Sequence, residues 1–170
     1  MSADHPTIKH LNDALLEGLG KQADLAQRKR TNFNLHESLD DPVQRFLNAM
    51  QPGTYVRPHR HNNPVKWELT VALRGRAAVL ILDPNGLVLN RIELNAMGPE
   101  LGVEIPAGTW HTYAALAPDT VLLEVKRGPY LAHGDKDFAE WAPAEGMPSC
   151  AAYEARLRNA QPGDSLIVKF

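Results

Sequence analysis

Residues 53–75 read GTYVRPHRHNNPVKWELTVALRG, and a second short motif, IPAGTWH, occupies residues 105–111. In an extended strand, side chains two positions apart point to the same face, so we expect Arg57, His59 and His61 to share one face. Two imidazoles on one face can bind the same ion. The first stretch therefore predicts half of a metal site carried by a β-strand.

Glu68 and His111 can complete this set to three neutral nitrogens and one carboxylate. Such a set suits a divalent first-row metal at ligand distances of about 2.0–2.2 Å. We therefore predict one divalent ion, which could be Zn, Fe, Mn or Ni, bound by His59, His61, Glu68 and His111. Four protein ligands leave positions for water or substrate on an ion that takes five or six, which is typical of catalytic rather than structural sites.

Together the two stretches resemble the two signature motifs of the cupin superfamily. In the first motif, Gly53 is followed after five residues by residues 59–61 (HRH), and Glu68 then precedes Gly75. The second motif is PAGTWH, residues 106–111. This resemblance implies a small β-barrel with a metal held on its inner face.

The chain departs from the general cupin pattern at two points. Six residues separate His61 from Glu68, where the general signature has about three or four. This longer spacer contains Pro64 and must loop out if Glu68 is to return to the metal. The second departure is Ala115, which stands where an asparagine usually follows the last histidine.

More narrowly, residues 30–146 resemble the WbuC-type cupin-fold metalloproteins, a bacterial group often linked to surface-polysaccharide clusters. The stretches that carry this resemblance are FNLHESLDDPVQRFLNAMQPGTYVRPHRH, VEIPAGTWHTY, EVKRGPY and DKDFAEWAPAEG. The resemblance implies carbohydrate or sugar-nucleotide metabolism, through isomerisation or epimerisation with the metal as Lewis acid.

Two other functions remain open at this stage. Three histidines and one glutamate also suit oxygen-activating iron, so an Fe(II)-dependent dioxygenase is one alternative. The other is a non-catalytic binding module, in which the metal anchors a small anionic molecule. In every case we expect a small-molecule ligand.

Two further residues are candidates for catalytic roles. Tyr113 shares a face with His111 by strand alternation, so it is expected either to act near the metal as a hydrogen-bond donor or proton carrier, or to fill the barrel. Arg57 could bind an anionic or enolisable oxygen ligand, or could pair with a surface acid at the rim. Glu124 and Lys126 also share a face, and an ion pair between them is expected.

A chain of 170 residues is of the size of one domain. We predict a mainly β fold with a single cupin (jelly-roll) barrel over residues 33–128. An N-terminal helical extension over 1–32 precedes it, and a C-terminal extension over 129–170 packs on the barrel. Short strands with turn residues between them, and no intervening helices, favour this architecture.

The patterning also predicts individual elements. Apolar residues at helical spacing predict a helix over 8–19, with a polar continuation over 21–30. Asp41-Pro42 is typical of a helix start and predicts a short helix ending at Met50. Period-two patterning predicts the strands, at 33–36, 67–74, 76–82, 87–94, 103–105, 110–116 and 120–126. A second helix is predicted over 151–159, and 165–170 as a final strand or tail.

Composition excludes several classes of function. The net charge is −2 with acids and bases interspersed, so no field is built for nucleic acid or anionic lipid. Cys150 is the single cysteine and cannot form an internal disulfide. The N-terminus has no signal-like apolar core, and the longest apolar run, residues 77–82, is far too short for a membrane helix. We therefore expect a cytoplasmic protein, and edge strands with an apolar N-terminal helix favour a homodimer.

Overall fold

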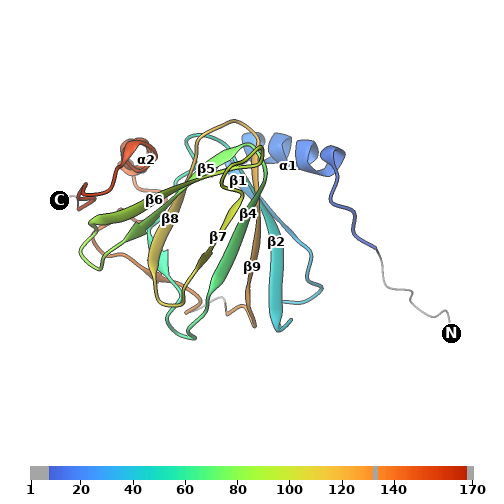
Figure 1. The fold of residues 1–170 in the computed structure, drawn as a ribbon, viewed down its shortest axis with the longest axis horizontal. Coiled ribbons are helices and arrows are strands. Elements are labelled where there is room, and N and C mark those ends of the chain that lie inside the picture. The colour runs from blue at the N-terminus through green and yellow to red at the C-terminus, as the bar shows by residue number, and fades with distance from the viewer. Residues whose placement is uncertain (1–7, 132–133, 168–170) are drawn as a thin grey trace.

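The computed structural model describes residues 8–131 and 134–167, which form two five-stranded antiparallel sheets packed face to face (Figure 1). The first sheet contains, in spatial order, β1 (Arg30–Asn34), β2 (Val43–Met50), β9 (Thr120–Arg127), β4 (Glu68–Arg74) and β7 (Gly102–Ile105). The second contains β10 (Asp137–Phe138), β3 (His59–Arg60), β8 (Trp110–Ala115), β5 (Arg76–Leu82) and β6 (Val88–Asn95). The predicted mainly β, jelly-roll architecture is confirmed.

The main core lies between the two sheets. Along β9, Thr120, Leu122, Glu124 and Lys126 are buried, whereas Leu123 and Val125, which point the other way, are only partly covered. The same period-two alternation operates in β4, as expected for a strand that packs one face on a core, whereas β5 is buried on both faces because Leu80 and Leu82 pack in a second cluster. At one end this core is apolar, with Met50, Val79 and Leu122 in one cluster. At the other end it is polar, and that end carries the site.

The helix α1 (Asp13–Leu25) covers part of the outer face of the first sheet. It begins later than residue 8 because Asn12 is its N-cap and accepts a hydrogen bond from the Leu15 backbone N–H at 3.0 Å, and it ends at Leu25, within the predicted continuation over 21–30. Its buried residues Leu16, Leu19 and Ala23 pack with Leu47, Ala49 and Val121 of the sheet. This packing, rather than intrinsic propensity, holds the helix.

The predicted helix ending at Met50 is wrong, because residues 43–50 form β2. The strand pairs with β1 on one side and with β9 along its whole length on the other. The Asp41 carboxylate does accept the Val43 backbone N–H at 3.0 Å, but it does so in a turn that leads into the strand. One face of β2 meets α1 and the other meets the cavity, so both faces are covered and no alternation marks it as a strand.

The C-terminal segment packs on the second sheet. Helix α2 (Cys150–Asn159), predicted over 151–159, buries Tyr153 and Leu157 in a cluster with Leu80 and Leu82 of β5. Ser165 bridges to Leu87 as an isolated strand pair, and the remainder of the predicted 165–170 element, from residue 168, lies outside the described residues. Neither α1 nor α2, the helices of the described ranges, has the length and hydropathy of a membrane span.

Candidate metal centre

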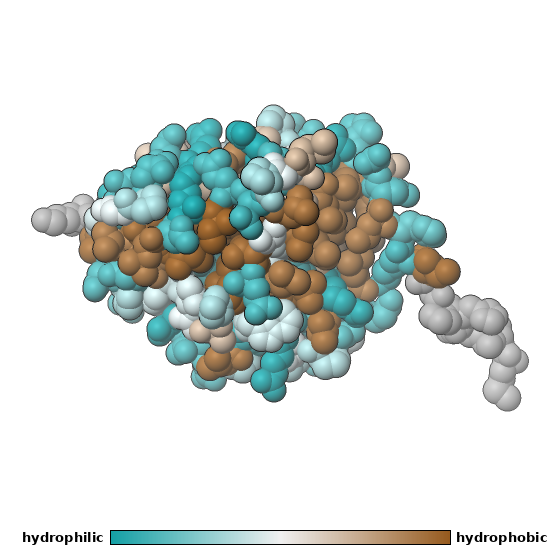
Figure 2. All heavy atoms as spheres, viewed as in Figure 1, coloured by the Kyte–Doolittle hydropathy of each residue, from teal (hydrophilic) through white to brown (hydrophobic). Residues whose placement is uncertain are grey.

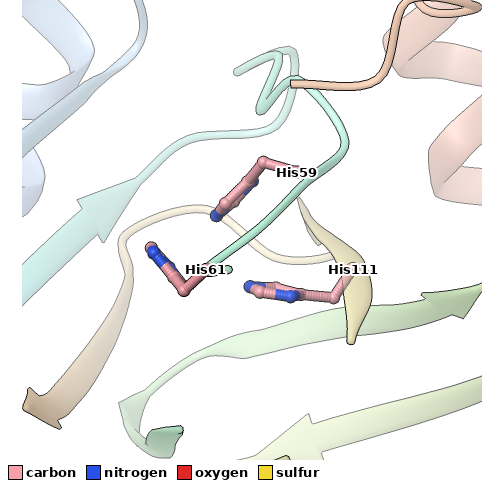
Figure 3. Close-up of side chains that lie close together, drawn as sticks. All are labelled: His59, His61 and His111. Atoms are coloured by element: carbon pink, nitrogen blue, oxygen red, sulfur yellow. The ribbon is translucent and has the colours of Figure 1, made fainter. Parts of the chain in front are cut away.

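Three histidines converge at the polar end of the barrel (Figure 3). His59 lies in β3 and pairs in register with His111 of β8, and His61 follows directly after β3. The ring centroids are 4.5 Å apart for His59 and His111, 5.3 Å for His59 and His61, and 5.8 Å for His61 and His111. One nitrogen from each ring lies within 4.8 Å of the others. The two motifs therefore meet as their strand spacing predicts.

Backbone carbonyls fix the tautomer of all three rings. His59 Nδ1 donates to Arg57 O at 2.9 Å, and His111 Nδ1 donates to Thr109 O at 2.9 Å. His61 Nδ1 donates to Asp135 O at 2.6 Å. A carbonyl can only accept, so each Nδ1 carries a proton and a neutral ring keeps a lone pair on Nε2. This is the outer-shell arrangement of histidines that bind a metal.

Burial disfavours the charged form of two of the three rings. Burial lowers the pKa of His59 well below its ordinary value, and it also lowers the pKa of His111. Nε2 of His59 and Nε2 of His111 are buried and have no hydrogen-bond partner among the described residues. Buried polar atoms are rarely left unpaired, so these two lone pairs fit a bound cation.

Glu68 of β4 reaches the same point from the opposite sheet. Its Oε2 lies 3.2 Å from His61 Nε2, and its Oε1 lies 3.9 Å from His111 Nε2. Two ligands bound to one ion at about 2.1 Å are separated by about 3.0–3.4 Å, so the first distance suits a shared metal. Burial alone would raise the pKa of Glu68, but in the metal-free protein a hydrogen bond from His61 Nε2, which a metal would replace, and nearby positive charge hold that pKa well below its ordinary value. The residues present therefore fit a divalent metal.

Tyr113 orients Glu68 from behind. Its hydroxyl donates to Glu68 Oε1 and lies 2.9 Å from Thr70 Oγ1. Burial, followed by the Glu68 carboxylate, raises the pKa of Tyr113 well above its ordinary value, so the phenol keeps its proton. Tyr113 also lines the cavity described below.

We predict that Tyr113→Phe lowers metal affinity by about 10–100-fold while the fold is retained. The reason is that the phenol fixes the carboxylate, and removal of such outer-shell partners has costs of this size. Competition with a fluorescent chelator measures the affinity, and Tyr130→Phe, an exposed tyrosine, is the matched control. An unchanged metal affinity in Tyr113→Phe would show that the hydroxyl does not orient a ligand.

A buried ion network that the sequence gives no sign of lies behind His61. Asp135, whose carbonyl holds the His61 ring, accepts hydrogen bonds on its carboxylate from Lys66 at 2.5 Å and Lys126 at 3.3 Å. The Lys66 ammonium also donates to Pro129 O at 2.6 Å. Lys126 therefore pairs with Asp135. Its position on β9 had predicted an ion pair with Glu124 instead. No motif links residues so distant along the chain, so only the structure brings them together.

Arg57 lies beside the metal site but is already occupied by protein partners. Its guanidinium donates to Ala139 O from Nε at 3.2 Å and from Nη2 at 2.7 Å. It also lies 5.4 Å from the centre of the Phe138 ring. Arg57 thus ties the β10 segment to β3, although it still lines the cavity and could meet a ligand there.

A cavity of about 530 Å³ opens next to the triad. Inward-facing residues of β1, β2 and β9 form one wall, His59 and Tyr113 lie in another, and Lys136 and Phe138 from the C-terminal segment close the third. Glu124 projects into it from β9, with Oε1 accepting a hydrogen bond from Asn48 at 2.7 Å. Its Oε2 has no hydrogen bond with a described residue. Burial, then the Glu68 charge, raises the pKa of Glu124 to about 7.

The raised pKa of Glu124 makes stability depend on pH. The folded metal-free protein holds the Glu124 proton up to about pH 7, whereas the unfolded chain releases it near 4.5. The contribution of Glu124 to the free energy of unfolding is thus fully present below the pKa of the unfolded chain. It is lost as the pH rises through the higher pKa of the folded protein. Glu124→Gln should gain about 2–3 kcal/mol relative to the native chain between about pH 5 and pH 8. Urea unfolding measures this, with Glu100→Gln, an exposed acid, as control; parallel pH curves for native chain and Glu124→Gln would contradict it.

Comparison with known sequences identifies no protein of assigned activity. Residues 11–94 match the model of a domain of unknown function, DUF6016. No curated protein matches the chain.

Comparison with solved structures identifies the fold. CapF from Staphylococcus aureus, described as a capsular polysaccharide assembling protein, matches at 20% identity over 64% of this chain and 29% of its own, with a TM-score of 0.51. Another CapF structure, bound to an inhibitor, gives 0.57 at 19% identity over 68% of this chain and 33% of its own. This chain thus spans about a third of the length of CapF.

Two further structures complete the comparison. ChmJ, a 3'-monoepimerase from Streptomyces bikiniensis in complex with dTDP, matches at 16% identity over 58% of this chain and 52% of its own, with a TM-score of 0.50. A cupin superfamily protein from Desulfitobacterium hafniense matches at 22% identity over 62% and 85%, with a TM-score of 0.46. The chain has a cupin-type barrel, and a buried histidine triad within it could bind a metal.

Proposed function

We propose that this chain is a mononuclear metal-dependent enzyme that isomerises or epimerises a small polar metabolite, with His59, His61, His111 and Glu68 as the metal ligands. One observation carries the proposal. Three buried imidazoles converge with their Nδ1 atoms bonded to backbone carbonyls, and one of them, His59, lines an open cavity. A structural metal site would have no need of a cavity large enough for a metabolite.

Each residue of the site has a defined part in this proposal. A bound divalent ion would supply Lewis-acid polarisation of a substrate oxygen. Glu124, with one oxygen on Asn48 and a pKa near neutrality, is placed to take a proton from one substrate carbon at its free oxygen and, in an isomerisation, to return it to the neighbouring carbon. Tyr113 keeps Glu68 in place, and Arg57 faces the ligand from the rim.

Carbohydrates and sugar nucleotides are the proposed substrate class. Two proteins of similar fold favour it, since CapF is described as assembling capsular polysaccharide and ChmJ as a 3'-monoepimerase that binds dTDP. The cavity agrees with such substrates in chemistry, because most of the side chains that line it are polar or charged.

Proton exchange in D₂O tests the proposal without a known substrate. The protein is loaded separately with Zn, Mn, Ni and Fe(II), the last without oxygen, and incubated with a panel of sugars and sugar nucleotides. An isomerase or epimerase incorporates deuterium at one carbon of its substrate, which proton NMR detects as the loss of one C–H signal. His59→Ala and Glu124→Gln should both abolish the exchange, whereas Glu100→Gln should retain it.

Other outcomes favour the other two functions. Turnover that needs Fe(II) and oxygen, without deuterium incorporation, would identify a dioxygenase. Ligand binding in the metal-loaded protein without exchange or turnover would identify a non-catalytic binding module. Either result overturns the isomerase proposal and leaves the metal ligands in place.

We also propose that the protein is a cytoplasmic homodimer. Apolar side chains gather in a band across one face of the molecule (Figure 2). On the outer face of the first sheet, Leu69 pairs with Val125 and Val71 with Leu123, and all four are only partly covered. A second copy could bury them. Light scattering should give twice the chain mass, and Val71→Lys should give the monomer.

A further inference from the structure

The walls of the cavity beside the triad carry more positive than negative charge. Five basic side chains line it, namely Arg28, Arg30, Arg57, Lys126 and Lys136, against two acids, Glu124 and Glu145. Because burial and the Glu68 charge raise the pKa of Glu124 to about 7, this acid carries only part of its negative charge at neutral pH, which adds to the excess. A cavity with this excess favours an anionic occupant.

Protein groups already bind four of these five cations. Glu145 pairs with both Arg28 and Arg30, at 2.5 Å for Arg30. Arg57 is bound to a backbone carbonyl and Lys126 to the Asp135 carboxylate, as described above. These four side chains are therefore held in place, and a ligand would have to share them with their present partners.

Lys136 differs from the other four. It lines the cavity and is half-buried, yet it forms no ion pair or hydrogen bond with any residue of the described ranges. Burial, and then the charge of Lys126, lowers the pKa of Lys136. Enclosing an unpaired ammonium next to another cation costs free energy, and a bound anion would remove that cost.

The opposite wall offers hydrogen-bonding groups without partners. Asn32 and Asn34 lie on the inward face of β1, as their pairing with Asn48 and Phe46 shows, and both line the cavity. Neither amide has a hydrogen bond with a side chain or backbone group in the described part of the chain. An amide both donates and accepts, which suits the hydroxyl groups of a polyol.

We infer that the cavity binds a small polyhydroxylated anion, a sugar acid or a sugar phosphate, with its charged group on Lys136 and its hydroxyls on Asn32 and Asn34. This inference rests on the proposed function for the cavity's role as a substrate site. It adds the charge of the substrate and the residue that recognises it. Lys136 acts through binding and is a specificity-determining residue.

Isothermal titration calorimetry on the full, metal-loaded chain tests this inference with three probes: D-glucuronate, D-glucose 6-phosphate and neutral D-glucose. At least one anion should bind with an affinity about tenfold or more above that of glucose. The free energy of a hydrogen bond to a charged group corresponds to an affinity ratio of about this size. Which anion binds better distinguishes a carboxylate from a phosphate as the recognised group.

Variants at position 136 then locate the charge partner. Lys136→Ala and Lys136→Gln should each weaken the affinity for the anion by about tenfold or more and leave the affinity for glucose unchanged. Lys136→Arg should keep an anion affinity within about threefold of that of the native chain. Lys21→Ala, which removes an exposed lysine on α1, is the matched control and should change nothing. Because Lys136 has no partner among the described residues and its enclosed charge costs free energy, Lys136→Ala and Lys136→Gln should melt no lower than the native chain.

The outcomes separate this inference from the proposed function. Equal anion affinity in Lys136→Ala and the native chain, or glucose binding as tightly as both anions, or no binding of either anion, overturns the inference even if metal is present. Anion binding that depends on Lys136 but persists in metal-free His59→Ala protein supports the inference and removes the metal from substrate binding. Metal content, measured by mass spectrometry, should be the same in Lys136→Ala and the native chain.

Discussion

His111→Ala is expected to reduce metal affinity by more than about 100-fold, so that the purified variant contains almost no metal. The substitution removes one of three nitrogens within 4.8 Å of each other, a larger loss than that of an outer-shell partner, for which costs of about 10–100-fold are typical. Glu68 and two histidines would remain, with one position of the ion filled only by water. Metal analysis by mass spectrometry measures the stoichiometry directly.

The melting temperature gives a second measurement of the effect of His111→Ala on metal binding. A ligand present at about 100 times its dissociation constant stabilises the folded state by about 3 kcal/mol. Addition of metal should therefore raise the melting temperature of the native chain and not that of His111→Ala. His36→Ala is the control, because His36 is also buried and lines the cavity but bonds to the backbone of Arg45. Full metal content in His111→Ala would contradict the assignment of the site.

Lys66→Met is expected to destabilise the fold by about 3–5 kcal/mol, the second large effect. The Lys66 ammonium is fully enclosed, and its bonds to the Asp135 carboxylate and Pro129 carbonyl leave it no contact with water. Removal of Lys66 leaves the buried Asp135 carboxylate with only its more distant cation, Lys126 at 3.3 Å, and breaking a buried ion pair costs about 3 kcal/mol or more. Urea unfolding at neutral pH measures it. Lys29→Met, which breaks an exposed pair with Asp24, should cost less than about 1 kcal/mol.

A double-mutant cycle shows whether the effect belongs to the pair. Lys66→Met and Asp135→Asn together should cost less than the sum of the two single changes by at least about 1 kcal/mol, because each single change breaks the same Lys66–Asp135 pair. Additive costs would mean that Lys66 contributes through packing alone. Lys66→Met should also lower metal affinity, since Asp135 O holds the His61 ring.

The sequence predicts that the three histidines converge, because the determinants of this arrangement are local. Alternation along one strand is sufficient to place His59 and His61 on one side, and the second motif supplies His111 in register with His59. The long spacer before Glu68 loops out, as it must, and the carboxylate returns to within 3.2 Å of His61 Nε2. The barrel follows from the same period-two pattern.

What the sequence does not predict depends on contacts between distant segments. The strand β2 is covered on both faces, so its apolar pattern resembles that of a helix. Asp135, Lys66 and Lys136 belong to no motif, and their roles depend on how the C-terminal segment packs against the barrel. Alternation in β9 does predict that Glu124 and Lys126 lie on the same side of the strand, which is the cavity side. It does not predict that Lys126 pairs with Asp135.

The ligands come from both sheets, and this has a mechanical consequence. The three histidines belong to β3, β8 and the residue after β3 in the second sheet, whereas Glu68 belongs to β4 in the first. An ion held by all four would act as a removable crosslink between the two layers at the open end of the barrel. Loss of the ion would allow the two sheets to move apart at the open end of the barrel. The metal-free protein would then fluctuate more at this end than at the apolar end.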